Sequence, residues 1–429
     1  MRISLPPQDG SDAAAHSAPT ARAVLHPAVV VAALGYFVDI YDLILFNIVR
    51  IPSLTAMGVT GDALVSEGLA IINAQMVGML LGGIAFGIIG DKLGRLQILF
   101  GSITLYSLAT IANGFVGVQD VLPPLVEYRL LRFIAGVGLA GELGAGVTLV
   151  AEILPARLRG YGTMLVASVG VSGAVVANLI AKHMDWRIAY WVGGGLGLVL
   201  LVLRINVRES AMFDRTARSG VHRGDFFALF RGGRFGRYLA TILIGVPIWF
   251  SNAILVALSP EFARVLGVQG RISAGDAVMM FYGGLVAGDV ASGVISQALQ
   301  SRRKVVFAFL TALFVSNLLY FALGRGATPA LFLALIALLG VTAGYWAIFI
   351  TVGAEQFGTN LRATVATTVP NFVRGLVAVV TLSFEALRPR LGLAGAAAAV
   401  GAVWFALAFV SALRLRETFG IDLDYVEKG

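Results

Sequence analysis

The sequence predicts an all-α integral membrane protein with twelve transmembrane helices in two pseudo-symmetric bundles of six. Three observations lead to this fold class. Of the 429 residues, 58% are hydrophobic and only 13% are charged, too few charges to cover a water-soluble domain of this size. Twelve apolar stretches are long enough to cross a bilayer. Short motifs of the first half of the chain also recur in the second half.

The twelve apolar stretches define the expected helices, since roughly 20 apolar residues span the hydrocarbon core. They lie near 28–50, 67–90, 97–118, 123–151, 161–182, 186–207, 237–259, 274–297, 304–324, 329–352, 364–386 and 392–413. The chain ends and even-numbered connections carry more than twice as many lysines and arginines as the odd-numbered connections. Because positive residues accumulate on the cytoplasmic side, we expect both termini to be cytoplasmic in a bacterial-type inner membrane.

The same pattern predicts the organisation of the chain. Residues 1–26 contain proline, serine and alanine without a long apolar run, so we expect a disordered cytoplasmic tail. Bundles at 27–208 and 237–414 are joined by a cytoplasmic loop at 209–236, and a cytoplasmic tail follows at 415–429. The loop mixes arginine with phenylalanine, which is typical of a surface helix on anionic membrane lipid. The net charge of +8 therefore indicates a membrane contact and no nucleic acid partner.

Repeated motifs relate the two halves. Glu152 and Arg159, after the fourth segment, correspond to Glu355 and Arg362 after the tenth. An Arg-Glu-Ser sequence after the sixth segment likewise returns as Arg-Glu-Thr after the twelfth. Transporters with such internal repeats bind their substrates between the repeats near the middle of the membrane.

Six charged residues stand well inside the apolar segments, where a charge costs roughly 2.5–3.5 kcal/mol and needs a partner or a cavity. They are Asp39, Asp42, Arg132, Glu142, Asp289 and Arg374. Ion pairs that only hold helices together are one interpretation, above all for Arg132 and Glu142. The other is proton coupling, which we assign to Asp39, Asp42, Asp289 and Glu142, whose buried carboxylates can carry a proton, and to Arg132 beside them.

Arg374 lies near the middle of the eleventh segment, and its guanidinium stays protonated. A carboxylate substrate would give it a bidentate partner. We expect further substrate contacts from Tyr36, Trp249, Asn252 and Tyr345. The predicted partners are therefore a small organic anion and the proton, with no cofactor and no metal.

The connection between the second and third segments carries a distinctive motif. Its residues, in order, are Gly87, Asp91, Lys92, Gly94 and Arg95. They resemble the Gly-x-x-x-Asp-Arg/Lys-x-Gly-Arg signature of the major facilitator superfamily. The resemblance implies the fold of that family and a cytoplasmic conformational gate formed by these residues. The preceding glycines, Gly78, Gly82 and Gly83 among them, predict a close helix–helix approach.

A narrower resemblance is carried by Asp39-x-Tyr-Asp42 and by the run from Arg132 to Glu142. Both are similar to the metabolite:proton symporters and the aromatic acid:proton symporters of that superfamily. The resemblance implies proton-coupled symport of a small organic acid by alternating access.

Two other functions stay open on the sequence alone. A proton-driven polyspecific efflux antiporter would use an aromatic cavity, although Arg374 opposes cationic drugs. A membrane-embedded lipid or prenyl transferase would need Asp39 and Asp42 to hold a metal, but no second acidic cluster faces them. The four histidines lie outside the segments or at their edges, so no serine–histidine pair can form in the membrane.

Overall fold

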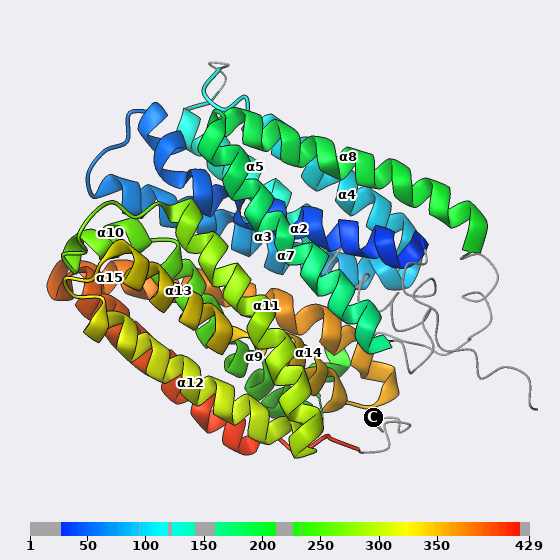
Figure 1. Cartoon of the computed structure of the whole chain (residues 1–429). Helices are drawn as coiled ribbons and strands as arrows, with labels where there is room; N and C mark the ends of the chain where they lie inside the picture. Colours follow the sequence, from blue (N-terminus) through cyan, green and yellow to red (C-terminus); the bar gives the residue numbers. More distant parts are fainter. Residues whose placement is uncertain are drawn as a thin grey trace, which may run out of the picture.

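The computed structural model describes residues 27–93, 95–118, 122–141, 159–211, 226–231 and 233–420. Within these ranges the chain forms helices and no strand, which confirms the all-α prediction. Figure 1 shows the helices in two bundles lying side by side, blue to green for the first and green to red for the second.

The described part of the first bundle contains six helices. They are α2 (Pro27–Ala56), α3 (Ala63–Leu93), α4 (Arg95–Asn113), α5 (Pro124–Leu139), α7 (Arg159–His183) and α8 (Trp186–Ala211). A short 3-10 helix, η2 (Phe226–Phe230), precedes the second bundle. It is the described part of the predicted surface helix, most of which lies outside the described residues.

The second bundle also has six membrane-spanning segments, and two of them are interrupted. Its elements are α9 (Arg234–Phe250), the π-helix η3 (Ser251–Val256), α10 (Ser259–Val265), α11 (Ala274–Leu299), α12 (Arg302–Leu323), α13 (Pro329–Ala343), α14 (Trp346–Glu355) and α15 (Thr359–Arg414). The last of these is two spans, because Gly392 adopts φ 68° and breaks the helix between them.

Each of the twelve predicted segments overlaps a helix of the structure, although the end of the fourth, from residue 142 on, lies outside the described residues. Eight helices in the described part of the chain are long and apolar enough to cross a membrane, and one of these, Thr364–Arg414, holds the last two spans. The spans expected at 237–259 and 329–352 are present, but neither is a uniform α-helix. The first passes into a π-helix, and the second breaks between α13 and α14.

Glycine contacts show the repeat most directly. A Cβ atom at Gly78 of α3 would overlap the carbonyl oxygen of Phe133 in α5. A Cβ atom at Gly284 of α11 would overlap the carbonyl oxygen of Ala337 in α13 in the same way. Small residues let membrane helices approach closely where no hydrophobic effect drives them together. The predicted close approach is thus confirmed for α3, and the second bundle repeats it.

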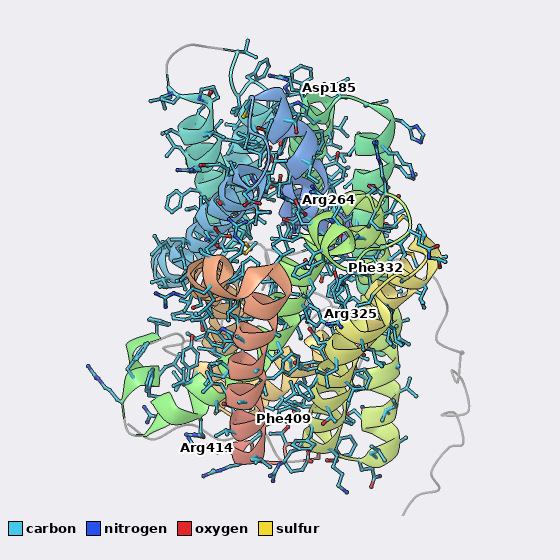
Figure 2. The ribbon with its side chains drawn as sticks, turned by 90° about the vertical axis from the view of Figure 1, so that its left-hand side faces the viewer. Asp185, Arg264, Arg325, Phe332, Phe409 and Arg414 are labelled. Carbon is cyan, nitrogen blue, oxygen red and sulfur yellow. The ribbon has the colours of Figure 1, made fainter. Side chains whose placement is uncertain are left out.

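The two ends of the molecule are distinguished by the connections that they carry. The inner end carries the connections α3–α4, α8–α9 and α11–α12, together with the C-terminal segment. The outer end carries the connections α2–α3, α7–α8 and α12–α13. Figure 2 views the molecule from the side on which α10 lies, and both figures place α10 where the two bundles meet.

Candidate functional site

Arg374 is the charged group at the centre of the candidate site. It lies on the first span of α15, one helical turn after Pro370, and is 2% exposed. Its guanidinium carbon is 5.1 Å from the ring centre of Trp249 and 5.6 Å from that of Trp346. The Nε and Nη1 atoms make no hydrogen bond with any described residue. Two aromatic faces thus hold a cation whose donors remain available to an anion.

A small cavity joins Arg374 to the first bundle. Tyr36 and Asp39 of α2 line it together with Arg374, and apolar side chains complete the wall: Ile40, Leu43, Met79 and Leu139. Its space for a water-sized sphere is about 10 Å³, roughly the room of one water molecule. Three predicted site residues therefore meet where the bundles meet, and the site is closed around them.

Asp42 has a different environment from Asp39, although only one helical turn separates them. Arg132 donates from Nη1 to the Asp42 carboxylate at 3.2 Å and from Nη2 to its backbone oxygen at 3.0 Å. Thr110 donates to the same carboxylate at 2.8 Å, and both charged side chains are fully buried. Asp42 and Arg132 therefore form an ion pair inside the first bundle, while Asp39 faces the cavity.

The interruption of the seventh span positions Asn252 and Trp249. Pro247 lacks a backbone donor, and Ser251 closes the turn by donating its hydroxyl to the Pro247 oxygen at 3.0 Å. The π-helix that begins at Ser251 adds a residue to the turn, as often occurs at functional sites. Asn252 then donates from Nδ2 to the Tyr282 hydroxyl at 2.9 Å, and its buried Oδ1 has no partner among the described residues.

Tyr345 and Asp289 belong to the break in the tenth span. The Tyr345 hydroxyl donates to the Ile244 oxygen at 2.8 Å, so this buried side chain fastens the break to α9 and does not line the cavity. Asp289 accepts a hydrogen bond from the Ala347 amide at 3.1 Å, at the N-terminus of α14. A carboxylate is favourable there because the first amides of a helix lack partners.

The remaining predicted residues are only partly visible. Glu142 and Gly94 lie outside the described residues. Gly87, Asp91 and Lys92 belong to α3 and Arg95 begins α4, but the described part of the chain does not include their side chains. The backbone has one residue between the two helices, as expected for a tight link.

Among the described residues, several hydrogen bonds between the bundles lie at the outer end. The strongest involves Arg50 of α2, whose Nη2 donates to both carboxylate oxygens of Glu261 in α10 at 2.7 and 2.8 Å. The same guanidinium donates to the backbone oxygens of Leu64 and Ala257. Arg50 is fully buried and the Glu261 side chain is 8% exposed. This buried pair therefore joins the two bundles beneath the outer surface.

Two further helix pairs close the same end. Thr381 of α15 donates to Asn73 of α3 at 2.6 Å. Between α7 and α11, Asn178 donates to Asp276 at 3.1 Å, and Lys182 forms a more exposed ion pair with the same carboxylate at 3.4 Å. The outer end is accordingly closed in this structure.

Some residues that complete the site carry no signal in the sequence. Thr110, Met79 and Asn371 stand in apolar helices, and nothing in their spacing along the sequence identifies them as site residues. Asn371 donates to the Ala140 oxygen at 3.4 Å and fits against Gly83, so it links α15 to the first bundle. Arg50 and Glu261 lie at segment ends, where charges are ordinary.

Comparisons with known proteins agree with this architecture. Residues 32–382 match the family described as the Major Facilitator Superfamily. A probable 4-methylmuconolactone transporter of Cupriavidus pinatubonensis is 27% identical over 412 residues, which cover 91% of this chain and 90% of the relative. The 3-(3-hydroxy-phenyl)propionate transporter of Escherichia coli is 26% identical over 303 residues, covering 68% and 71%.

A solved structure shares the fold. The proton:xylose symporter XylE, bound to 6-bromo-6-deoxy-D-glucose, aligns with a TM-score of 0.67 over 94% of this chain and 98% of that chain. At 16% identity this likeness concerns the fold alone. The matched family consists of transporters, so the transferase considered above is wrong. The chain is an integral membrane protein and belongs to the major facilitator superfamily.

Proposed function

We propose that this protein is a proton-coupled symporter that moves a small organic anion by alternating access, with both termini in the cytoplasm of a bacterial-type cell. One observation carries the proposal. Arg374 of the second bundle and Asp39 of the first line the same buried cavity. A fixed cation and a protonatable acid then face one another at the place where the bundles must separate.

The cation selects the sign and shape of the substrate. Arg374 has donors without partners in the described part of the chain and lies against two indole rings. A planar carboxylate can take two parallel hydrogen bonds from a guanidinium, and a flat substrate can pack on the tryptophans. The two relatives named above are called transporters of a methylmuconolactone and of a hydroxyphenylpropionate. These small organic compounds are of the chemical class that we propose for the substrate.

The acid links substrate loading to the proton. Arg374 and Asp39 line the same cavity, and their opposite charges attract one another. A substrate carboxylate at Arg374 would compete for that attraction, so Asp39 would bind a proton more readily, and this coupling is reciprocal. We assign the proton to Asp39 rather than Asp42 because Asp42 is already neutralised by Arg132. Asp289 is the second candidate, since its carboxylate caps the broken tenth helix.

The cavity must open for the substrate to enter. Its present room is that of about one water molecule, so a carboxylate with several carbon atoms does not fit until the bundles rotate. The outer contacts described above would hold one side closed while the other opens.

The test is proton movement in proteoliposomes that contain a pH-sensitive dye. Mono-, di- and aromatic carboxylates are added in turn, and at least one class is expected to drive proton uptake. Asp39→Asn should abolish pH-driven accumulation but keep exchange of labelled substrate, which needs no net proton movement. Asp276→Asn, a change of the same chemistry at the outer surface, should keep both.

Two results would contradict the proposal. Concentrative uptake by Asp39→Asn at the wild-type level would remove the proton from Asp39. Proton release driven by cationic dyes, with no response to any carboxylate, would favour the efflux antiporter instead.

A further inference from the structure

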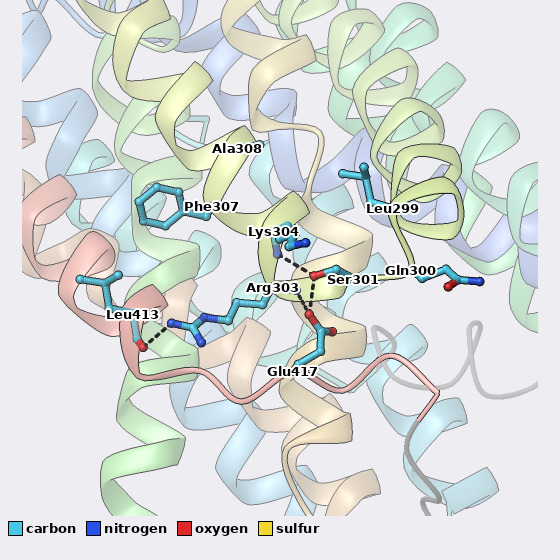
Figure 3. Close-up of a pocket in the computed structure, with 9 residues that line it drawn as sticks. All are labelled: Leu299, Gln300, Ser301, Arg303, Lys304, Phe307, Ala308, Leu413 and Glu417. Carbon is cyan, nitrogen blue, oxygen red and sulfur yellow. Dashed lines mark hydrogen bonds between the residues drawn. The ribbon is translucent and has the colours of Figure 1, made fainter.

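A groove on the second bundle lies away from the candidate substrate site. It has a volume of about 660 Å³ and runs between the start of α12 and the end of α15, at the inner end of the molecule (Figure 3). Arg303 and Lys304 form its basic rim, and Leu299, Phe307 and Leu413 supply apolar walls. The proposed transport cycle makes no use of this groove.

The basic rim carries positive charge that the described part of the protein does not neutralise. Arg303 and Lys304 are both exposed, and neither has an ion-pair partner among the described residues. Arg303 uses one donor on the Leu413 backbone oxygen at 2.9 Å, which leaves the other guanidinium donors available. Their neighbour Arg302 differs, because it pairs with Glu355 at 3.4 Å and so belongs to the packing of the bundle.

Among the described residues that line the groove, Glu417 is the one acid, and its oxygens are already occupied. One oxygen accepts from the Ser301 hydroxyl and from the Arg303 amide. The other accepts from the backbone amides of Arg302, Thr418 and Phe419. Figure 3 shows the Glu417 carboxylate turned toward Ser301, with the Arg303 side chain directed along the groove to Leu413. The carboxylate is thus shielded by five donors, and the charge presented by the rim is positive.

The apolar walls lie next to the basic rim. Phe307 is 41% exposed and lies one helical turn along α12 from Arg303, about 6 Å deeper in the membrane. Leu299 and Leu413 are 51% and 61% exposed. A ligand that fits this groove has an anionic end at the membrane surface and an apolar chain directed into the bilayer.

We propose that the groove binds one anionic phospholipid of the leaflet at the inner end. Its phosphate lies between Arg303 and Lys304, and an acyl chain lies along Phe307 and Leu413. Because Glu417 ties the C-terminal segment to the start of α12, a lipid seated here also stabilises that attachment. The lipid is a structural and regulatory ligand, distinct from the transported anion.

The test measures lipid binding directly. Detergent-solubilised protein is titrated with dioleoyl phosphatidylglycerol, or with phosphatidylcholine of the same chains, and bound lipid is counted by native mass spectrometry. The double variant Arg303→Gln/Lys304→Gln should weaken phosphatidylglycerol binding about thirtyfold, because each basic residue near an anionic lipid contributes a factor of about five. Phosphatidylcholine binding should be weak in wild type and unchanged in the variant.

Controls separate the groove from general charge and from folding. Arg264→Gln/Arg271→Gln removes the same charge at the outer end and should bind phosphatidylglycerol as wild type does. Lys304→Gln alone should weaken binding about fivefold, and it breaks no side-chain hydrogen bond or ion pair with the described residues. Phe307→Ala should weaken lipid binding but not that of glycerol phosphate, which lacks acyl chains.

Three outcomes would overturn the proposal. Equal phosphatidylglycerol binding by wild type and the Arg303/Lys304 variant would remove the site. Equal weakening by the outer-end control would show a general charge effect. Binding of glycerol phosphate as tight as that of the lipid would assign the groove to a soluble anion.

Discussion

Replacing Glu261 by glutamine should open the outer end of the protein. Arg50 and Glu261 come from different bundles and are buried together, with both carboxylate oxygens within 2.8 Å of one guanidinium nitrogen. In a state that is open at the outer end the two bundles separate there, so this pair exists only in the closed state. Removing it must therefore shift the equilibrium between the two states.

The size of the shift follows from burial. Removing one partner of a buried ion pair costs about 3–5 kcal/mol, because the other charge stays buried without compensation. Glutamine retains one oxygen that can accept from Arg50, which places Glu261→Gln near the lower figure of about 3 kcal/mol. That is a shift of about a hundredfold or more toward the outward-open state.

The assay is a distance measurement across the outer end. Spin labels at Thr60 and Arg325, exposed positions on different bundles, report the separation by pulsed electron resonance in nanodiscs. The chain contains no cysteine, so two introduced cysteines are the only labelled sites. We expect one short distance in the wild type and a longer, dominant distance in Glu261→Gln.

A matched control removes another acid that joins the bundles. Asp276→Asn breaks the ion pair with Lys182, but this pair is accessible to water. The Lys182 side chain is 55% exposed and the Asp276 side chain is 26% exposed. Exposed ion pairs contribute about 0–1 kcal/mol, so the distance distribution of Asp276→Asn should stay close to that of the wild type. The same distribution in Glu261→Gln and wild type would refute the assignment of the pair to an outer gate.

Two further predictions concern stability. Asp42→Asn should lower the free energy of unfolding in detergent by about 3–5 kcal/mol, because Arg132 is left buried without its partner. The double variant Asp42→Asn/Arg132→Gln should lose less stability than the sum of the two single variants, and additive losses would contradict the ion pair. Burial of Glu417 raises its pKa, but hydrogen bonds from Ser301 and from the Phe419, Arg302 and Thr418 amides outweigh this and lower the pKa to about 2. The ionised Glu417 therefore stabilises the fold at a pH above its unfolded pKa, and this stabilisation is lost as the pH falls through its folded pKa. The melting-temperature difference between wild type and Glu417→Gln should be constant from pH 7 to 5 and shrink only below about 4.5. A difference that changes between pH 7 and 5 would contradict this.

The sequence predicted the twelve spans because apolar length and the placement of basic residues are properties of the chain itself. It also marked Arg374 and Asp39, since a charge inside an apolar segment is conspicuous without any structure. The positions at which helices break were harder to predict from the sequence. Pro247 and Gly344 are tolerated in membrane helices, and only packing against neighbours decides whether the helix continues or breaks.

Partners across helices were not predictable from spacing. Asp39 and Asp42 lie one helical turn apart, and both were assigned to proton coupling. The structure gives them different surroundings, because Asp42 pairs with Arg132 of α5 whereas Asp39 lines the cavity with Arg374. Likewise Tyr345 has the depth of a cavity residue, but its hydroxyl is taken by the Ile244 oxygen. Such choices depend on helix rotation and on which backbone oxygens lie within reach.

The central claim is that Arg374 binds the carboxylate of the substrate. The measurement is the Kd of the carboxylate that drives the strongest proton uptake, determined by calorimetry on the wild type and on Arg374→Lys, Arg374→Ala and Arg132→Lys. Lysine keeps the charge but loses the planar fork, and hydrogen bonds to charged groups contribute about 1.5–3 kcal/mol, so both Arg374 variants should bind at least tenfold more weakly. Arg132→Lys, in the buried pair with Asp42, should bind as the wild type does. An unchanged Kd in both Arg374 variants would contradict the account and place the substrate elsewhere.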